Sequence, residues 1–202
     1  YVVAGQKSGD VWALDPNSGS LIWKRKMGRG GLLGGIHFGM AFSEGKIYVP
    51  INDADLASKY AEAYTSDKWP GEKNPGLYAL DVKTGDTVWE WAAVDICAGR
   101  PGCKKGNDPV ITATPELVFA GSLDGHLRIH DADSGDVLWT FNTAREYPTP
   151  SGGTALGGSL EGPTGAVLQD GMMFLNSGYL FNQHMPGNVV LAFSVNEKIE
   201  QP

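Results

Sequence analysis

The sequence lacks several features that would place it at once in a large class of proteins. No apolar run approaches the ~20 residues that a membrane-spanning helix needs, so such a helix is excluded. Acidic residues outnumber basic ones, 23 against 16, and the net charge of −7 argues against a nucleic acid or an anionic membrane as partner. The chain has no initiating Met and opens on "YVVAG", which is typical of a strand interior, so we expect a piece of a longer protein.

Catalytic motifs with a fixed spacing are also missing. No Ser-His-Asp triad and no phosphate-binding loop appear, and the stretch "GRGGLLGG" (28–35) lacks the strand–helix context of a dinucleotide site. There is no C-x-x-C-H motif, so any haem must belong to another domain or another protein.

Cysteine is scarce, with only Cys97 and Cys103, which flank Ala-Gly-Arg-Pro-Gly. A loop of this length can close a disulfide, worth about 2 kcal/mol by loop-entropy reasoning. Two free thiols are the alternative, and zinc is disfavoured because no second Cys/His pair stands at zinc spacing. A disulfide would indicate an oxidising compartment, which in a bacterium is the periplasm.

What the sequence does contain is a repeat with the spacing D-x3-G-x3-W. It occurs three times, at Asp15/Gly19/Trp23, at Asp81/Gly85/Trp89 and at Asp131/Gly135/Trp139. Each copy reads as a strand of alternating polarity, a turn capped by Asp in which Gly supplies a positive φ, and a second strand. The Trp falls on one face of that second strand, where a neighbouring unit can bury it.

The repeat predicts an all-β chain, a β-propeller of four-stranded antiparallel blades. We place the repeat hairpins at 9–26, 76–92 and 125–142, and a truncated last blade at 165–195 in which Ser194 takes the Asp position. The ragged ends favour about half of an eight-bladed ring over a closed four-bladed ring. Such a half-ring exposes strand edges, so we expect it to self-associate.

Two insertions interrupt the repeats. Residues 52–75, whose first half could form one or two helical turns, and the Gly-rich stretch 145–165 are either binding loops or covers for blade edges. Trp69, in the first insertion, is placed to line a groove, whereas the other tryptophans are expected to pack between blades.

Three further stretches carry a resemblance to a known family. They are "KSGDVWALDPNSG" (7–19), "GGIHFGMAFSEGKIYVP" (34–50) and "ITATPELVFAGSLDGHLRIHDADSGDVLWTF" (111–141). Together with the repeat they resemble the quinoprotein alcohol dehydrogenases that use pyrroloquinoline quinone (PQQ). The segment "GGLLGGIHFGMA", the cysteine loop and "GGSLEGPTGAVLQDGMMFLNSGY" are similar to the polyvinyl alcohol dehydrogenase branch of that family.

The resemblance implies a cofactor site and a reaction. Lys7 matches the cation that reaches the quinone oxygens, and His37 and Phe38 stand where the family has an Asn-Trp pair that contacts PQQ. The implied activity is periplasmic oxidation of secondary alcohols such as polyvinyl alcohol, with hydride transfer to PQQ, Ca²⁺ as Lewis acid and a cytochrome c as electron acceptor. The catalytic base and the calcium ligands lie upstream in the family, within the rest of the propeller, so this chain alone should be inactive.

Other interpretations stay open. Similar repeats build non-catalytic scaffolds or sensors that bind protein partners in outer-membrane assembly, and a pseudo-enzyme would also keep the cofactor frame. Lys7 could be an ordinary exposed lysine, His37 a structural residue and Phe38 a core residue. The remaining candidates are a D-x-D metal site or turn cap at Asp53 and Asp55 and a surface pair at His126 and His130. Lys24–Lys26 and Arg29 either attract a cofactor carboxylate or form a solvated basic strand end.

Overall fold

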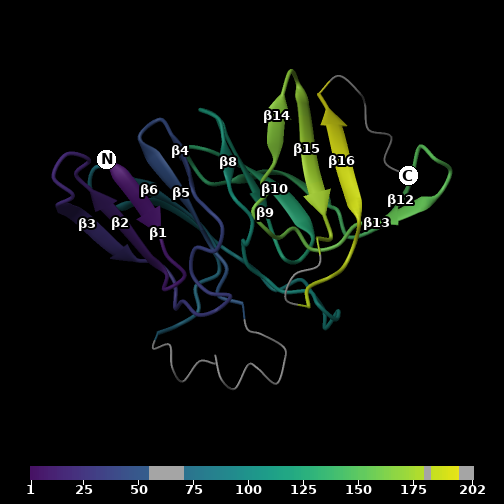
Figure 1. Cartoon of the computed structure of the whole chain (residues 1–202), viewed down its shortest axis with the longest axis horizontal. Coiled ribbons are helices and arrows are strands. Elements are labelled where there is room, and N and C mark those ends of the chain that lie inside the picture. The colour runs from purple at the N-terminus through teal and green to yellow at the C-terminus, as the bar shows by residue number, and fades with distance from the viewer. Residues whose placement is uncertain (55–70, 180–182, 196–202) are drawn as a thin grey trace.

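The structure, a computed structural model, describes residues 1–54, 71–179 and 183–195 (Figure 1). These residues form strands and loops, with no helix among them. In this part of the chain no helix is therefore long and apolar enough to cross a membrane. The helical turns expected in the first insertion, together with Asp55 and Trp69, lie outside the described residues.

Apart from one two-stranded hairpin, the strands of the described residues form four successive antiparallel sheets. The first contains β1 (Val2–Gly5), β2 (Asp10–Leu14) and β3 (Leu21–Lys26), and the second contains β4 (Ala41–Ser43), β5 (Lys46–Ile51), β6 (Gly76–Asp81) and β7 (Thr87–Ala92). The third contains β8 (Thr112–Ala113), β9 (Leu117–Gly121), β10 (His126–Asp131) and β11 (Val137–Asn142), and the fourth contains β14 (Val167–Gln169), β15 (Met172–Ser177) and β16 (Val189–Ser194).

The sheets follow one another in chain order across the molecule, from β1–β3 to β14–β16 (Figure 1). Each strand pairs with its neighbour in sequence, which is the up-and-down order of propeller blades. The expected all-β propeller fold of four-stranded antiparallel blades is confirmed, with the first and last sheets three-stranded in this chain. Part of the Gly-rich insertion is not loop but a separate hairpin of β12 (Glu146–Pro148) and β13 (Thr154–Leu156).

Side chains on both faces of the second sheet are buried, because this sheet packs between two others. Successive residues of a strand point to opposite faces, so one strand supplies both contacts. The side chains that face the first sheet are Ile47, Val49, Ile51, Tyr78 and Leu80, and those that face the third are Tyr48, Leu77 and Ala79. The core of the protein therefore lies between sheets, with one apolar cluster at each junction.

A tryptophan on the last strand of one sheet docks on the turn of the next sheet. The Trp89 indole N–H donates to the carbonyl of Ala132 at 3.0 Å, and Trp23 donates to Val82 in the same way at 2.9 Å. The indole of Trp89 leaves no room for a side chain at Gly135, where a Cβ would lie 2.6 Å from the ring. The repeated Gly is therefore needed for this contact as well as for its backbone conformation.

The aspartate of each repeat caps the same turn. The carboxylate of Asp131 accepts hydrogen bonds from two backbone N–H groups of its turn, and Asp15 and Asp81 do the same in theirs. The bond from the Ser134 N–H is the main reason why the pKa of Asp131 lies below its ordinary value. The turn chemistry expected from the spacing is thus confirmed.

The third repeat tryptophan, Trp139, has a different environment. The fourth sheet has no repeat glycine after Ser194, and Trp139 packs instead against the rings of Phe141 and Phe193, at centroid distances of 5.5 and 5.8 Å. An apolar groove of about 710 Å³ lies beside it, lined in part by Met172 and Val195.

His130 is not half of a surface pair, so that hypothesis is wrong. Its side chain is fully buried, stacked on Trp89 at a centroid distance of 6.2 Å and edge-on to Trp91 at 5.3 Å. Its Nδ1 lies 3.0 Å from the carbonyl of Gly135 and donates to it, whereas Nε2 is buried with no hydrogen-bond partner. His126, at the other end of the strand, stays partly exposed.

We predict that Gly→Ala substitutions in two repeat turns distinguish the stability cost of losing the indole contact from the cost of backbone strain. Gly19 and Gly135 have similar positive φ values, +71° and +79°, but a Cβ at Gly19 meets nothing within 4 Å. Gly19→Ala should carry the backbone strain alone, about 1–2 kcal/mol. Gly135→Ala should cost about 1–3 kcal/mol more, because its methyl group overlaps the Trp89 indole.

Urea unfolding of the two variants measures this difference. Equal midpoints for Gly135→Ala and Gly19→Ala would show that the indole–glycine contact does not limit the packing of the sheets.

We also predict that the free energy of unfolding decreases less in acid for His130→Leu than for the wild type. Burial, helped by the nearby charge of Arg128, lowers the pKa of His130. The unfolded chain, with a histidine pKa of about 6.5, then binds a proton before the folded protein does, so stability falls as the pH drops below that value, by at most about 1.4 kcal/mol per pH unit. Leucine, which the repeat has at Leu14 and Leu80, removes this proton.

Thermal unfolding between pH 7 and pH 5 gives the comparison. The melting temperature of His130→Leu should rise relative to that of the wild type as the pH falls. A constant difference between His130→Leu and wild type across this range would contradict the prediction.

Candidate functional site

Most of the polar candidates lie on one edge of the sheets, which we call the loop edge. It is formed by the connections within the β1–β2, β5–β6, β9–β10 and β15–β16 pairs and by the segments that lead from one sheet to the next. In Figure 1 it is the lower edge, and the β1–β2 and β15–β16 connections lie at its two ends.

Lys7 is exposed on the β1–β2 connection and is held against the segment that follows β3. Its Nζ donates to the carbonyl of Leu32 at 3.2 Å, and its own carbonyl accepts from the N–H of Gly31 at 3.1 Å. The two segments touch so closely at Gly35 that a Cβ there would lie 2.7 Å from the Lys7 carbonyl oxygen. At the equivalent position of the third sheet stands Leu123, which is fully buried, so the first sheet places an exposed cation where the third sheet buries an apolar side chain.

His37 lies on the same segment and its imidazole is fixed by a buried carboxylate. Its Nδ1 is 2.6 Å from Asp108 Oδ1, and the two side chains are 2% and 1% exposed. Asp108 also accepts from the side-chain amide of Asn52 and from the N–H of Gly162 at 3.0 Å. The ring of Phe38 lies 4.2 Å from that of His37, between centroids, at a tilt of 48°.

Asp53 clamps the segment that carries these residues. Its carboxylate accepts four backbone N–H groups, from Arg29 at 2.7 Å, Gly30 at 3.0 Å, Gly35 at 2.7 Å and Asn74 at 3.0 Å. Both carboxylate oxygens are occupied by these donors, so Asp53 is a structural clamp and not a metal ligand.

Among the basic residues around β3, Lys24 and Lys26 are exposed, as a solvated strand end would have them, whereas Arg29 is buried. Arg29 is 7% exposed and its Nε donates to the carbonyl of Gly30. Lys24 pairs with Asp10 at 3.3 Å and lies 4.2 Å over the ring of Trp12.

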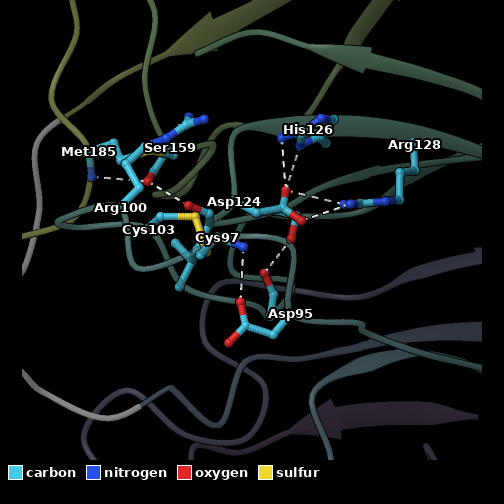
Figure 2. The surroundings of a disulfide bond; sticks show 12 residues. Asp95, Cys97, Arg100, Cys103, Asp124, His126, Arg128, Ser159 and Met185 are labelled. Carbon is cyan, nitrogen blue, oxygen red and sulfur yellow. Dashed lines mark hydrogen bonds and ion pairs between the residues drawn. A yellow bond between two sulfur atoms is a disulfide. The ribbon is translucent and has the colours of Figure 1, made fainter.

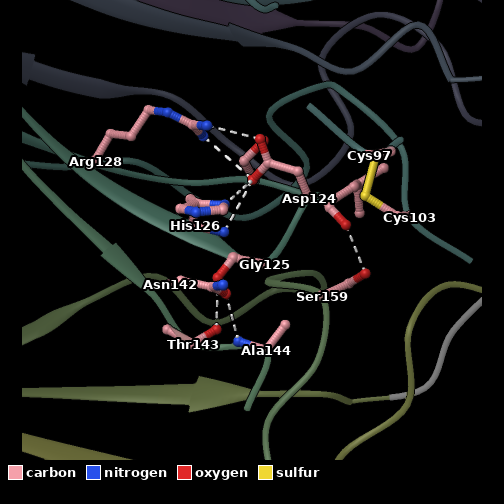
Figure 3. A network of polar contacts seen from close by, with 12 residues as sticks. Cys97, Cys103, Asp124, Gly125, His126, Arg128, Asn142, Thr143, Ala144 and Ser159 are labelled. Carbon is pink, nitrogen blue, oxygen red and sulfur yellow. Dashed lines mark hydrogen bonds and ion pairs between the residues drawn. A yellow bond between two sulfur atoms is a disulfide. The ribbon is translucent and has the colours of Figure 1, made fainter. Parts of the chain in front are cut away.

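A second charged network lies at the start of β10 (Figure 3). The Asp124 carboxylate accepts from both terminal nitrogens of Arg128, at 3.2 and 2.7 Å, and from the His126 N–H at 2.9 Å. Burial raises the pKa of Asp124, but the bonds from His126 and Arg128 outweigh it and the pKa lies below its ordinary value. Arg128 also covers Trp91 of the preceding sheet at 5.1 Å, so this network joins two sheets.

The structure joins Cys97 and Cys103 in a disulfide with a Cα–Cα distance of 5.5 Å (Figure 2). Asp95 caps the loop by accepting the Cys97 N–H at 2.9 Å. Both cysteines are buried against Met185, and the loop reaches the β15–β16 connection so closely that a Cβ at Gly102 would lie 2.8 Å from backbone there. The disulfide therefore braces the far end of the loop edge.

A second carboxylate–imidazole pair, Glu161 and His184, was missed by the sequence analysis. His184 Nδ1 lies 2.5 Å from Glu161 Oε2, and both residues are buried. Glu161, Asp108 and His37 occupy equivalent positions on the three segments that lead into a sheet. Each follows by two residues a backbone carbonyl that accepts a hydrogen bond from an N–H in a strand connection of that sheet. The three accepting and donating residues are Gly35 with Asn52, Gly106 with Leu123, and Ser159 with Gly178.

A signal for this pair was present in the sequence. Aligning the segments between sheets, instead of the hairpins alone, would have placed a titratable residue at the same point three times, as His37, Asp108 and Glu161. The pairing of His184 with Glu161 could not be read in this way, because the β15–β16 connection has a length of its own.

The residues around Lys7 fit a flat, polyanionic cofactor such as PQQ. They offer an exposed ammonium group on the β1–β2 connection and, on the adjacent segment after β3, an aromatic ring at Phe38 and an imidazole oriented by Asp108. They do not fit calcium: in the described part of the chain no group of three or more His, Cys, Asp or Glu residues could hold a metal ion. No chemistry of the described residues is therefore assigned to calcium.

Comparison with known proteins gives the chain its relatives. The model of the PQQ-repeat family described as "Outer membrane protein assembly factor BamB" matches residues 7–190. The chain is 40% identical to a polyvinylalcohol dehydrogenase of Pseudomonas sp and 34% identical to one of Sphingopyxis sp. (strain 113P3), in both cases over 98% of this chain and 31% of the relative. The chain thus spans about a third of the length of these two proteins.

Solved structures show the same architecture. The crystal structure of BamB from Moraxella catarrhalis aligns with 87% of this chain and 39% of that protein, with a TM-score of 0.55 and 20% sequence identity. At this identity the likeness concerns the fold alone. Because the family model covers most of the chain and the repeats form its sheets, the protein belongs to the PQQ-repeat family of β-propellers, in which it is similar to polyvinyl alcohol dehydrogenases.

Proposed function

We propose that the chain is part of a PQQ-dependent alcohol dehydrogenase that oxidises secondary alcohols such as polyvinyl alcohol. The observation that carries this proposal is the exposed Lys7, in a position where the third sheet has the buried Leu123, next to the segment that carries the oriented imidazole of His37. The identity of 40% to a polyvinylalcohol dehydrogenase over nearly the whole chain supports it.

Each residue has a distinct role in this proposal. PQQ, when bound, accepts hydride from the alcohol carbon. Lys7 holds a positive charge where negative charge develops on the quinone oxygens, and a preplaced charge of this kind stabilises the transition state. His37 and Phe38 bind and orient the cofactor, while Asp108 fixes the imidazole of His37. The catalytic base and the calcium ligands are proposed to lie in other parts of the complete protein.

The cellular setting is part of the same proposal. The Cys97–Cys103 disulfide supports an oxidising compartment, which for a bacterial protein is the periplasm. A cytochrome c is the proposed electron acceptor, since PQQ must be reoxidised after each hydride transfer.

A scaffold function is the second candidate, and one observation favours it. The groove of about 710 Å³ beside Trp139 is apolar and open, as a docking surface for a protein partner would be. The family model is named after an outer-membrane assembly factor. Against this candidate stands the elaborated loop edge, which a plain scaffold does not need.

We predict that Lys7→Met weakens PQQ binding by the complete protein about 10- to 100-fold, as loss of a charge-assisted hydrogen bond of about 1.5–3 kcal/mol requires. Fluorescence titration with PQQ, with and without Ca²⁺, measures this. Lys83→Met is the matched control, because Lys83 is an exposed lysine on a repeat turn away from the loop edge, and it should bind as the wild type does.

Two outcomes would count against the proposal. Equal affinities of Lys7→Met and Lys83→Met would remove Lys7 from the site. Failure of the well-folded wild-type protein to bind PQQ would overturn the dehydrogenase and leave the scaffold as the better candidate.

A further inference from the structure

The Glu161–His184 pair has no part in the cofactor contacts proposed above. Its two residues are 3% and 4% exposed and come from different connections, the segment before β14 and the β15–β16 connection. The two segments are joined next to the pair, because the Ser159 N–H donates to the carbonyl of Met185. The Met185 N–H in turn donates to the Ser159 hydroxyl (Figure 2). The imidazole of His184 is therefore held on a rigid frame.

The carboxylate of Glu161 determines which nitrogen of His184 is available. A carboxylate accepts a hydrogen bond, so it takes the N–H of Nδ1, and the neutral imidazole then presents Nε2 as an acceptor. In the described part of the chain, the buried side-chain atoms without a partner are Asn107 Oδ1 and His130 Nε2. Nε2 of His184 makes no hydrogen bond among the described residues and is not one of these two enclosed atoms.

His184 stands on the same edge as Lys7 but at its other end. Lys7 lies on the connection between β1 and β2 of the first sheet, and His184 on that between β15 and β16 of the fourth (Figure 1). A chain of contacts links them: the Lys7 connection packs on the His37 segment, and Asp108 joins His37 to the N–H of Gly162. Gly162 follows Glu161 directly.

We propose that His184, oriented by Glu161, binds a second hydroxyl group of a polyhydroxylated substrate through Nε2. This inference rests on the proposed function, in which the reacting hydroxyl lies near Lys7. Two middle sheets separate His184 from Lys7 along the loop edge, so His184 meets a part of the substrate away from the reacting carbon. A chain that carries a hydroxyl on every second carbon presents such a group, and a simple alcohol does not.

The chemistry of the pair fits a neutral hydroxyl better than a charged ligand. In the neutral imidazole Nε2 offers one lone pair, and the negative charge of Glu161 is already engaged with Nδ1. A metal ion would need further ligands, which the described residues around the pair do not supply. A donated hydroxyl hydrogen bond of about 1 kcal/mol is worth about fivefold in binding.

The test compares a diol with a simple alcohol in the complete protein. For wild type and His184→Phe, which keeps a flat ring but has no acceptor, kcat/KM is measured with pentane-2,4-diol and with pentan-2-ol. The ratio of kcat/KM for the diol to kcat/KM for the simple alcohol should be about five- to tenfold lower in His184→Phe than in the wild type. The matched control is His126→Phe, which removes another loop-edge imidazole and should leave the ratio at its wild-type value.

A second measurement uses the wild-type protein without PQQ, so it does not depend on cofactor binding or on the folding of a variant. The imidazole nitrogen signals of the PQQ-free wild-type protein are followed by ¹⁵N NMR, and the Nε2 signal of His184 should shift with pentane-2,4-diol and not with equal pentan-2-ol. The inference would be overturned if the diol-to-alcohol ratio of kcat/KM were unchanged in His184→Phe. It would also be overturned if the Nε2 signal of His184 did not shift when the diol is added. Absence of PQQ binding in the wild type would overturn only the proposed dehydrogenase, since the NMR result stands independently of it.

Discussion

The structure depends on one contact that is made between sheets and not within them: the face of an indole against a glycine backbone. A sheet that lies between two others buries side chains on both of its faces, so its packing depends on both neighbours. The Trp89 ring on Gly135, with its N–H bonded to the Ala132 carbonyl, fixes how far apart and in which register two neighbours sit. Any side chain larger than hydrogen at Gly135 would push the sheets apart.

This fixed spacing is what allows the loop edge to hold polar groups so tightly. Because the sheets cannot shift, a carboxylate on one segment can be matched to donors on another, as Asp53 is to four backbone N–H groups. Asp108 is matched in the same way to His37, and Glu161 to His184. Burying these three carboxylates without partners would destabilise the protein, and their hydrogen bonds offset the cost of removing them from water.

The position of a residue in the repeat also distinguishes structural from functional candidates. His130 replaces a buried leucine of the repeat and becomes part of the core, where it has no access to a ligand. Lys7 does the opposite, replacing the buried Leu123 of another sheet by an exposed cation. A substitution of a repeat residue therefore changes the packing of the core when it lies on a strand, as at His130. On the loop edge, as at Lys7, it changes the groups that a ligand can meet.

The sequence by itself determined the fold class, the capped turns and the docking tryptophans, because these follow from local spacing: Asp, Gly and Trp act within one hairpin or on the next. It also pointed to Lys7, His37 and Phe38 as candidates. Only the tertiary structure decided that His130 is buried, that Asp53 clamps a segment, and that His37 meets Asp108 and His184 meets Glu161. Those partners are 71 and 23 residues apart in the chain, and which loops meet depends on the packing of whole sheets.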